Sequence, residues 1–162
     1  MRISIILGSA RPDGNTEKVI RQIPELEQAF LLKLADHQVY HYNYEHQHPE
    51  DDEFMSIMEE LIPKTDLFLF ATPIYWYAMS GHMKVFLDRF TDLLKINKPL
   101  GRTLRGKSMA MLSCSNGDDR PAGFDIPFEL TADYLGMEYK GNVHYWLEDG
   151  QIFKSAVGEI NY

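Results

Sequence analysis

The chain has 162 residues, of which 44% are hydrophobic and 25% are charged. This length and composition predict a single domain, residues 1–162, with a sizeable buried core, and they exclude a chain that is disordered throughout. The formal net charge of −8 argues against a nucleic-acid partner, because an acidic protein repels phosphate backbones. The single cysteine excludes a disulfide framework and any cysteine-rich zinc or iron–sulfur site.

Two further absences concern the membrane and export. No run of 18 apolar residues occurs, so no membrane-spanning segment is predicted. The N-terminus enters a strand-like segment without a small-residue cleavage site, so no secretory signal is predicted. We therefore expect a cytoplasmic protein with no membrane partner.

Short apolar runs alternate along the chain with segments of helical periodicity. Strands are predicted at residues 2–7, 30–34, 66–71, 107–112 and 139–147. Helices are predicted at residues 16–22, 52–62, 80–94 and 128–135, with a long polar loop over residues 37–53. Asp149 and Gly150 predict a hairpin turn into a short last segment. This alternation predicts an α/β fold in which helices cover both faces of a parallel sheet.

The loop after the first predicted strand carries groups that suit a phosphate. Ser9, Asn15 and Thr16 offer hydroxyl and amide donors, and Arg11 offers a guanidinium fork. The N-terminus of the following helix adds free N–H groups and positive dipole. An anion cradle is therefore predicted, although a capped helix after an ordinary glycine-rich turn would give a similar pattern. The P-loop and G-x-G-x-x-G fingerprints are both absent.

The loop after the third predicted strand is aromatic. Tyr75, Trp76 and Tyr77 are consecutive, so they cannot all point into the core, and they suit contact with a planar ring. In a sheet of order 2-1-3-4-5 this loop lies beside the first loop, at the switch in strand order where ligands bind. By itself the aromatic loop would equally fit a packed loop or a dimer interface. Together the two loops indicate a planar, phosphorylated ligand, and FMN fits this description.

At these residues the chain resembles the NAD(P)H-dependent FMN reductase family. The matching segments are Gly8-Ser-x-Arg-x-x-Gly-Asn-Thr16 and Thr72-Pro-x-Tyr-Trp-x-x-x-Ser-Gly-x-x-Lys-x-Phe-x-Asp-Arg89. A weaker match is Ala132-Asp-Tyr-Leu-Gly-Met-Glu-Tyr-x-Gly141. The resemblance implies a flavodoxin-like three-layer sandwich with a five-stranded parallel sheet of order 2-1-3-4-5.

The resemblance also implies a cofactor site for FMN. Ser9, Arg11, Asn15 and Thr16 would hold the FMN phosphate. The residues expected to line the isoalloxazine ring are Pro73, Ile74, Tyr75 and Trp76, and the loop from Ser113 to Gly117 is expected to close its other edge. No catalytic side chain is assigned, because the flavin carries the chemistry. Tyr77, with its aromatic neighbours, is expected to shape the face that meets the substrates.

By the same resemblance, the protein is expected to be a homodimer or homotetramer that takes hydride from NADH or NADPH. It would pass the electrons to a flavin, a quinone or a similar small acceptor. Three features depart from the family pattern: Pro24 shortens or breaks the first helix, residues 40–53 are rich in histidine and tyrosine, and the usual final helix is missing.

Several alternatives remain open from the residues alone. Cys114 and Arg120 have the C-x5-R spacing of a tyrosine phosphatase, although Asp118 and Asp119 would repel a phosphate there. The histidines and carboxylates of residues 37–53 could bind zinc or copper. A flavodoxin-like electron shuttle without NAD(P)H oxidation, or a regulatory module without turnover, would also use this fold. Residues 102–107 form a small basic patch that could attract a 2′-phosphate.

Overall fold

The computed structural model describes all 162 residues. The strands are β1 (Ile3–Leu7), β2 (Phe30–Lys33), β3 (Leu67–Tyr75), β4 (Ala78–Met79), β5 (Ser108–Ser115), β6 (Glu138–Glu148) and β7 (Gln151–Lys154). The helices are α1 (Asn15–Ile20), α2 (Phe54–Lys64), α3 (Gly81–Asp88), α4 (Phe90–Lys95), α5 (Lys98–Arg102) and α6 (Ile126–Leu135), with single 3-10 turns at Pro24–Leu26 and Leu34–Asp36. The chain is thus a strand–helix alternation, as predicted.

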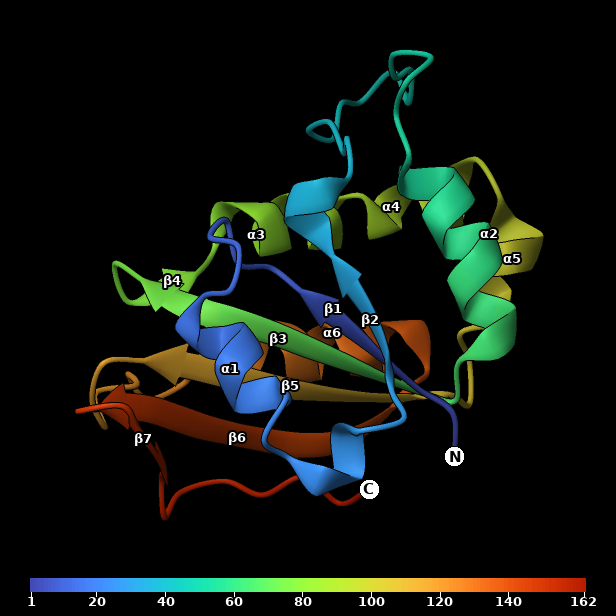
Figure 1. The fold of residues 1–162 in the computed structure, drawn as a ribbon. Coiled ribbons are helices and arrows are strands. Elements are labelled where there is room, and N and C mark those ends of the chain that lie inside the picture. Colours follow the sequence, from blue (N-terminus) through green and yellow to red (C-terminus); the bar gives the residue numbers. More distant parts are fainter.

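The sheet has the strand order β2-β1-β3-β5-β6-β7, and β4 pairs with β3 (Figure 1). The first five strands of this order are mutually parallel, which confirms the flavodoxin-like order 2-1-3-4-5. The predicted number of five strands was too small. Strands β4 and β7 are antiparallel additions formed by tight hairpins, whose turn residues Trp76, Tyr77, Asp149 and Gly150 all have positive φ.

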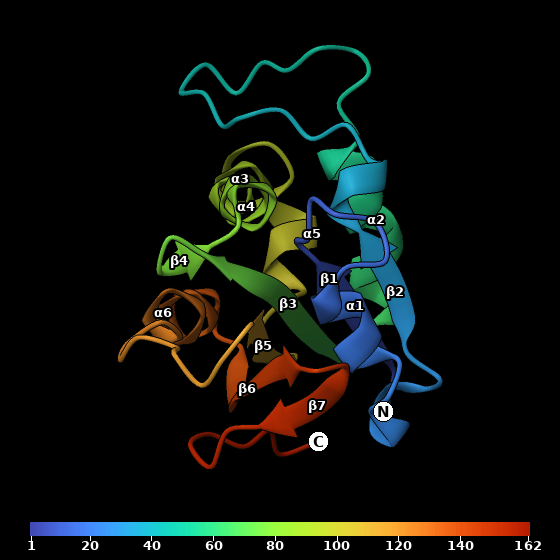
Figure 2. The same ribbon diagram turned by 60° about the vertical axis from the view of Figure 1, so that its left-hand side comes forward.

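The two faces of the sheet are covered unequally. Helices α2, α3, α4 and α6 bury one face in a cluster of 22 apolar residues. Helix α1, the 3-10 turn after it and the C-terminal segment cover the other face, over 14 buried apolar residues that include Ile160. Figure 2 shows the two layers on either side of the sheet. The C-terminal segment therefore helps to cover the face of the sheet on which α1 packs.

Several element boundaries differ from the prediction. The helix predicted at residues 80–94 is two helices, because Arg89 separates α3 from α4, and α5 was not predicted. Helix α1 ends at Ile20, four residues before Pro24. Strands β3 and β5 run further than predicted because they continue to pair, up to Pro73 opposite Cys114. These extensions carry both strands to the edge of the candidate site.

Residues 37–53 form a long loop that projects from the body of the molecule (Figure 1). The buried Arg89 anchors its end: Nη1 and Nη2 lie 2.6 and 2.8 Å from the two carboxylate oxygens of Asp52, and Nε lies 2.6 Å from Asp92. His46 Nδ1 lies 2.8 Å from Asp92 Oδ1, and His48 Nε2 lies 2.9 Å from Asp92 Oδ2, the oxygen that Arg89 also contacts. No three His, Cys, Asp or Glu side chains are arranged to hold a metal ion. In this loop, two of the histidines therefore serve as anchors.

No helix combines the length and the apolar character that crossing a membrane requires.

Candidate functional site

A cavity of about 160 Å³ opens where β1, β3 and β5 end. Its walls are the loop after β1, the end of β3 and the end of β5. The lining residues are Ser9, Arg11, Gly14, Asn15, Thr16, Pro73, Ile74, Tyr75, Cys114, Ser115 and Asn116. Seven of the predicted cofactor residues therefore lie around one cavity, at the carboxyl ends of the strands where open α/β sheets bind ligands.

The loop after β1 is held in place by its own polar groups. The hydroxyl of Ser9 accepts a hydrogen bond from the Arg11 amide at 3.2 Å. Ser80, the N-cap of α3, donates its hydroxyl proton to the carbonyl oxygen of Gly8. A Cβ atom at Gly8 would lie 2.8 Å from Ser80 Oγ and 2.9 Å from Met83 Cβ, so only glycine fits here. The loop is thus fixed against α3 before any ligand binds.

The cavity wall is rich in hydrogen-bond donors. The backbone and side chains of Ser9 and Thr16 are buried, whereas Arg11 is exposed at the rim. Asn15 Nδ2 donates to Asn116 Oδ1 at 3.3 Å and so joins the first loop to the loop after β5. No aspartate or glutamate lines the cavity. A cavity with a guanidinium and hydroxyls but no carboxylate, in a chain of net charge −8, fits a phosphate group.

The aromatic segment forms the tip of the β3–β4 hairpin, not an irregular loop. Tyr75 lines the cavity, but Trp76 and Tyr77 are 94% and 72% exposed and do not. Both occupy the turn with left-handed φ values of 49° and 65°. In a chain that folds alone this exposure is costly, because large apolar side chains meet water. The hairpin tip therefore presents two aromatic rings beside the cavity.

The predicted closing loop begins later than expected. Ser113 is fully buried within β5, so its placement in a loop at the edge of the ring was wrong. Gly117 lies in the loop but does not line the cavity. The wall is formed instead by Cys114, Ser115 and Asn116, which the sequence analysis covered only as part of a range. Strand β5 extends to Ser115, which turns Ser113 inward and brings the following residues to the site.

His144 on β6 is a residue that the sequence analysis missed. Its side chain is fully buried, and Nε2 lies 3.0 Å from the carbonyl oxygen of Gly117. A carbonyl oxygen only accepts, so Nε2 carries the proton and Nδ1 accepts from the Ser113 hydroxyl at 3.1 Å. His144 thus ties β5 and the loop after it to β6. Its only sequence signal was a histidine between Val143 and Tyr145, in the more apolar second half of the strand.

The structure argues against the phosphatase alternative. Cys114 is 2% exposed, and burial raises the pKa of its thiol to about 11. A thiol with that pKa stays protonated near neutral pH and is a poor nucleophile. Arg120 Nη1 donates instead to Asn142 Oδ1 at 2.6 Å. The C-x5-R spacing therefore has no phosphate-binding geometry here.

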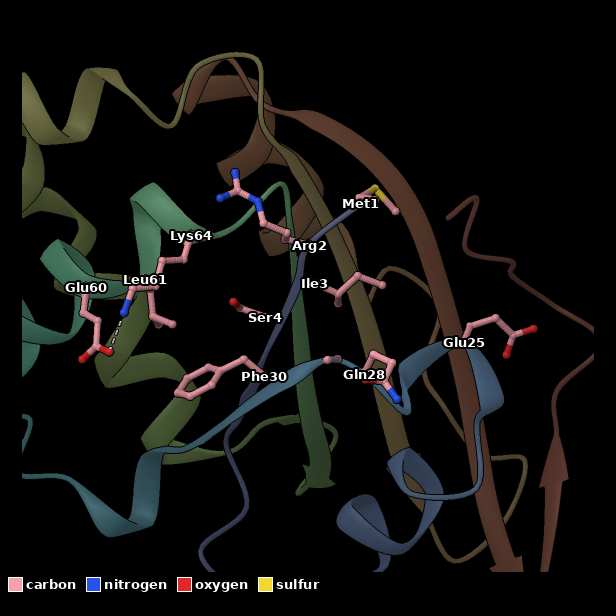
Figure 3. Close-up of a pocket in the computed structure, with 11 residues that line it drawn as sticks. Met1, Arg2, Ile3, Ser4, Glu25, Gln28, Phe30, Glu60, Leu61 and Lys64 are labelled. Atoms are coloured by element: carbon pink, nitrogen blue, oxygen red, sulfur yellow. Dashed lines mark hydrogen bonds and ion pairs between the residues drawn. The ribbon is translucent and has the colours of Figure 1, made fainter.

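A second cavity, of about 410 Å³, lies at the opposite end of the sheet (Figure 3). It is lined by the start of β1 and β2 and by α2, with Phe30 and Leu61 on its apolar side and the Glu60–Lys64 ion pair at its rim. None of the predicted site residues lies there. This end of a parallel sheet is not where α/β proteins of this order bind ligands.

The order of the parallel strands, with a cavity at its switch point, defines a protein of flavodoxin-like fold. The family model described as NADPH-dependent FMN reductase matches residues 1–149. A putative NAD(P)H-dependent FMN-containing oxidoreductase of Bacillus subtilis (strain 168), YwqN, is 30% identical over 88% of this chain and 83% of its own length. The chain belongs to the NADPH-dependent FMN reductase family, so it is an enzyme that uses FMN and a nicotinamide donor.

Two further comparisons agree with this assignment. A NADPH azoreductase of Bacillus sp. (strain OY1-2) is 31% identical over 62% of this chain and 56% of its own length. The solved structure described as the Trp repressor binding protein from Bacillus subtilis superposes with a TM-score of 0.71. It is 24% identical, with 91% of this chain and 85% of that chain covered, and supports the fold alone.

Proposed function

We propose that the protein oxidises NADH or NADPH through bound FMN and passes the electrons to a flavin, a quinone or a similar small acceptor. The observation that supports this best is the acid-free cavity at the switch point, where phosphate donors meet a wall formed by Pro73, Ile74 and Tyr75. The names of the relatives point the same way, since one is an FMN-containing oxidoreductase and another a NADPH azoreductase.

In this proposal the side chains bind and orient, and FMN supplies the two-electron chemistry when bound. Ser9, Arg11, Asn15 and Thr16 would hold the phosphate, with the exposed Arg11 at the rim of the cavity. Pro73, Ile74 and Tyr75 would form the wall for the ring system, beside Cys114, Ser115 and Asn116 from the neighbouring strand β5 and the loop after it. Hydride transfer between stacked rings requires no side-chain acid or base, only close and parallel placement. The rigid anchoring of both walls meets this requirement.

We propose further that the protein forms a homodimer or a homotetramer in which a second copy covers the aromatic hairpin tip. Trp76 and Tyr77 are exposed beside the cavity, and burying them against another copy would remove apolar surface from water. Light scattering coupled to size exclusion tests this: the native protein should elute as an oligomer, and Trp76→Ala with Tyr77→Ala should shift it toward monomer. A native monomer would contradict this part of the proposal.

The function is tested by spectroscopy followed by turnover. The purified protein, mixed with excess FMN and freed of unbound ligand, should retain flavin absorbance. Anaerobic NADH or NADPH should bleach it, and menadione, an azo dye or free FMN should restore it. A bound flavin that neither nicotinamide bleaches would favour an electron shuttle instead. A protein that retains no FMN would contradict the site.

A further inference from the structure

A cavity of about 590 Å³ lies on the other side of Tyr75 from the FMN cavity. Tyr75 lines both cavities, and Ala10 brings the phosphate loop to the edge of this one. Its apolar lining comes from Leu34, Val39, Val85 and Phe86. The volume lies within the usual range for small-molecule sites, about 300–1,000 Å³. A ligand here would be separated from the flavin position by one aromatic side chain.

The polar lining of this cavity contrasts with the composition of the chain. The sequence has 24 acidic residues and 6 histidines. None of the acidic residues lines the cavity, whereas His37, His41 and His82 do. His41 and His82 are exposed and make no hydrogen bond within the protein, so their ring nitrogens are free to meet a ligand. An imidazole presents an N–H donor in either of its protonation states.

The third histidine has a different role. His37 Nδ1 lies 3.0 Å from Glu53 Oε1, and Glu53 also accepts from the backbone of Gln38. This pairing fixes the start of the long loop as one wall of the cavity. The anchoring of Asp52 by Arg89 fixes the end of the same loop. The cavity wall is therefore held at both ends of the loop, although the loop has no regular secondary structure.

The opposite wall is the first turn of α3. Ser80, Gly81 and His82 line the cavity there, and a Cβ atom at Gly81 would meet nothing within 4 Å. A ligand in the cavity would thus face open space above the helix start, in a cavity that His41 and His82 also line. The positive end of the helix dipole adds modestly to the preference for negative charge that the imidazoles create. Apolar lining with partnerless N–H donors at the rim suits a flat aromatic body carrying one anionic group.

We propose that this cavity is a substrate subsite for aromatic anions, in which His41 and His82 bind the anionic group and the apolar lining holds the ring. That a ligand bound here takes part in the reaction rests on the proposed function, since the subsite lies beside the proposed FMN site. Two sources share this chemistry: a sulfonated or carboxylated acceptor, and the phosphorylated adenosine of NADPH.

The test measures binding rather than turnover. The probes are 2-naphthalenesulfonate and adenosine 2′-phosphate, each compared with its neutral counterpart, 2-naphthalenemethanol and adenosine. Titration calorimetry on the FMN-loaded protein should show at least one anion binding about tenfold more tightly than its neutral counterpart. The double variant His41→Ala, His82→Ala removes both N–H donors, so it should lose most of that preference and keep its affinity for the neutral probe. Lys84→Gln, on the exposed side of the same helix, removes a cation outside the cavity and should change neither affinity.

The possible outcomes distinguish failure of the proposed subsite from failure of the proposed function. Whichever anion shows the histidine-dependent preference identifies the source. Equal binding of anion and neutral probe, or a preference that persists in the double variant, would overturn the subsite. Competition between the anion and FMN would also overturn it, because the anion would then occupy the phosphate cradle. If the preference is observed but NAD(P)H does not reduce the bound FMN, the subsite stands and the proposed function fails.

Discussion

The imidazole of His144 donates from Nε2 to the carbonyl oxygen of Gly117 at 3.0 Å, across the gap between β6 and the loop after β5. The same ring receives the Ser113 hydroxyl at Nδ1, so one buried side chain holds both the strand and the loop that follows it. The loop carries Asn116, which lines the proposed FMN cavity and accepts a hydrogen bond from Asn15 of the loop after β1. His144 does not line the cavity, so it acts by holding the cavity wall in position.

Substitutions at His144 should distinguish the roles of its two ring nitrogens. Glutamine places an amide nitrogen near the Nε2 position, so His144→Gln should keep the bond to Gly117. Asparagine reaches only the Nδ1 position, so His144→Asn should lose that bond and weaken FMN binding about tenfold, within the 0.5–1.5 kcal/mol of a typical hydrogen bond. Fluorescence quenching of FMN measures the difference, and thermal unfolding of the apoprotein provides the control. Equal FMN affinity in the two variants would contradict the positioning role.

Arg11 should contribute binding energy to the phosphate and not to the ring. Arg11→Ala is expected to weaken FMN binding by about 1–3 kcal/mol, the range for a hydrogen bond to a charged group. The affinity for riboflavin, which has no phosphate, should be unchanged. Arg102→Ala, which removes an exposed cation on α5, serves as the matched control. A parallel loss of FMN and riboflavin affinity would show that Arg11 supports the loop and not the phosphate.

Arg89 should contribute to the stability of the fold and not to the affinity for FMN. It is 1% exposed, contacts two carboxylates, and lies 4.8 Å from the centroid of the Phe54 ring. Arg89→Ala leaves Asp52 and Asp92 without their cation, which is expected to lower the free energy of unfolding by about 3–5 kcal/mol. Urea denaturation measures the change. Arg2→Ala, which breaks an exposed ion pair with Asp66, should cost much less.

The same network predicts a dependence of stability on pH. Burial opposes the ionisation of Asp52 and Asp92. Hydrogen bonds outweigh this effect: Asp52 accepts from Arg89, and Asp92 accepts from His46 and Arg89. The pKa values of both carboxyl groups therefore lie below the ordinary 3.8. Carboxylates with lowered pKa stabilise the fold above the ordinary value and lose that contribution as the pH falls through the lowered one. Unfolding free energy should therefore fall below about pH 4, and the fall should be smaller in Arg89→Ala. An identical acid profile in both proteins would contradict this assignment.

Substitution of Trp76 should change the KM for the acceptor more than it changes the stability of the fold. Because the side chain is 94% exposed in a single copy, Trp76→Ala is expected to change the free energy of unfolding of the monomer by no more than about 0.5 kcal/mol. Loss of an aromatic contact worth about 0.5–1.5 kcal/mol should raise the KM for a planar acceptor roughly twofold to tenfold. Steady-state kinetics at saturating NAD(P)H measures this. An unchanged KM in an oligomeric variant would remove Trp76 from the substrate face.

The existence of the parallel strands and the identity of the first loop could be read from the sequence, because both depend on local patterns, whereas the order of the strands came from the resemblance to a known family. Apolar β-branched runs and helical periodicity are set by neighbouring residues, and Ser9, Arg11, Asn15 and Thr16 are close together in the chain. Gly8 also belongs to this local pattern, although the reason that only glycine fits it is a contact with α3.

Tertiary structure alone decided the rest. Whether Ser113 faces the site or the interior depends on how far β5 pairs with β3, and that pairing joins residues about 40 positions apart. The roles of His46 and His48 depend on Asp92, and that of His144 depends on Gly117, contacts that no spacing along the chain reveals. The exposure of Trp76 and Tyr77 follows from a tight hairpin in place of a loop. A side chain's function is set by its partners in space, and for these residues the partners lie far away in sequence.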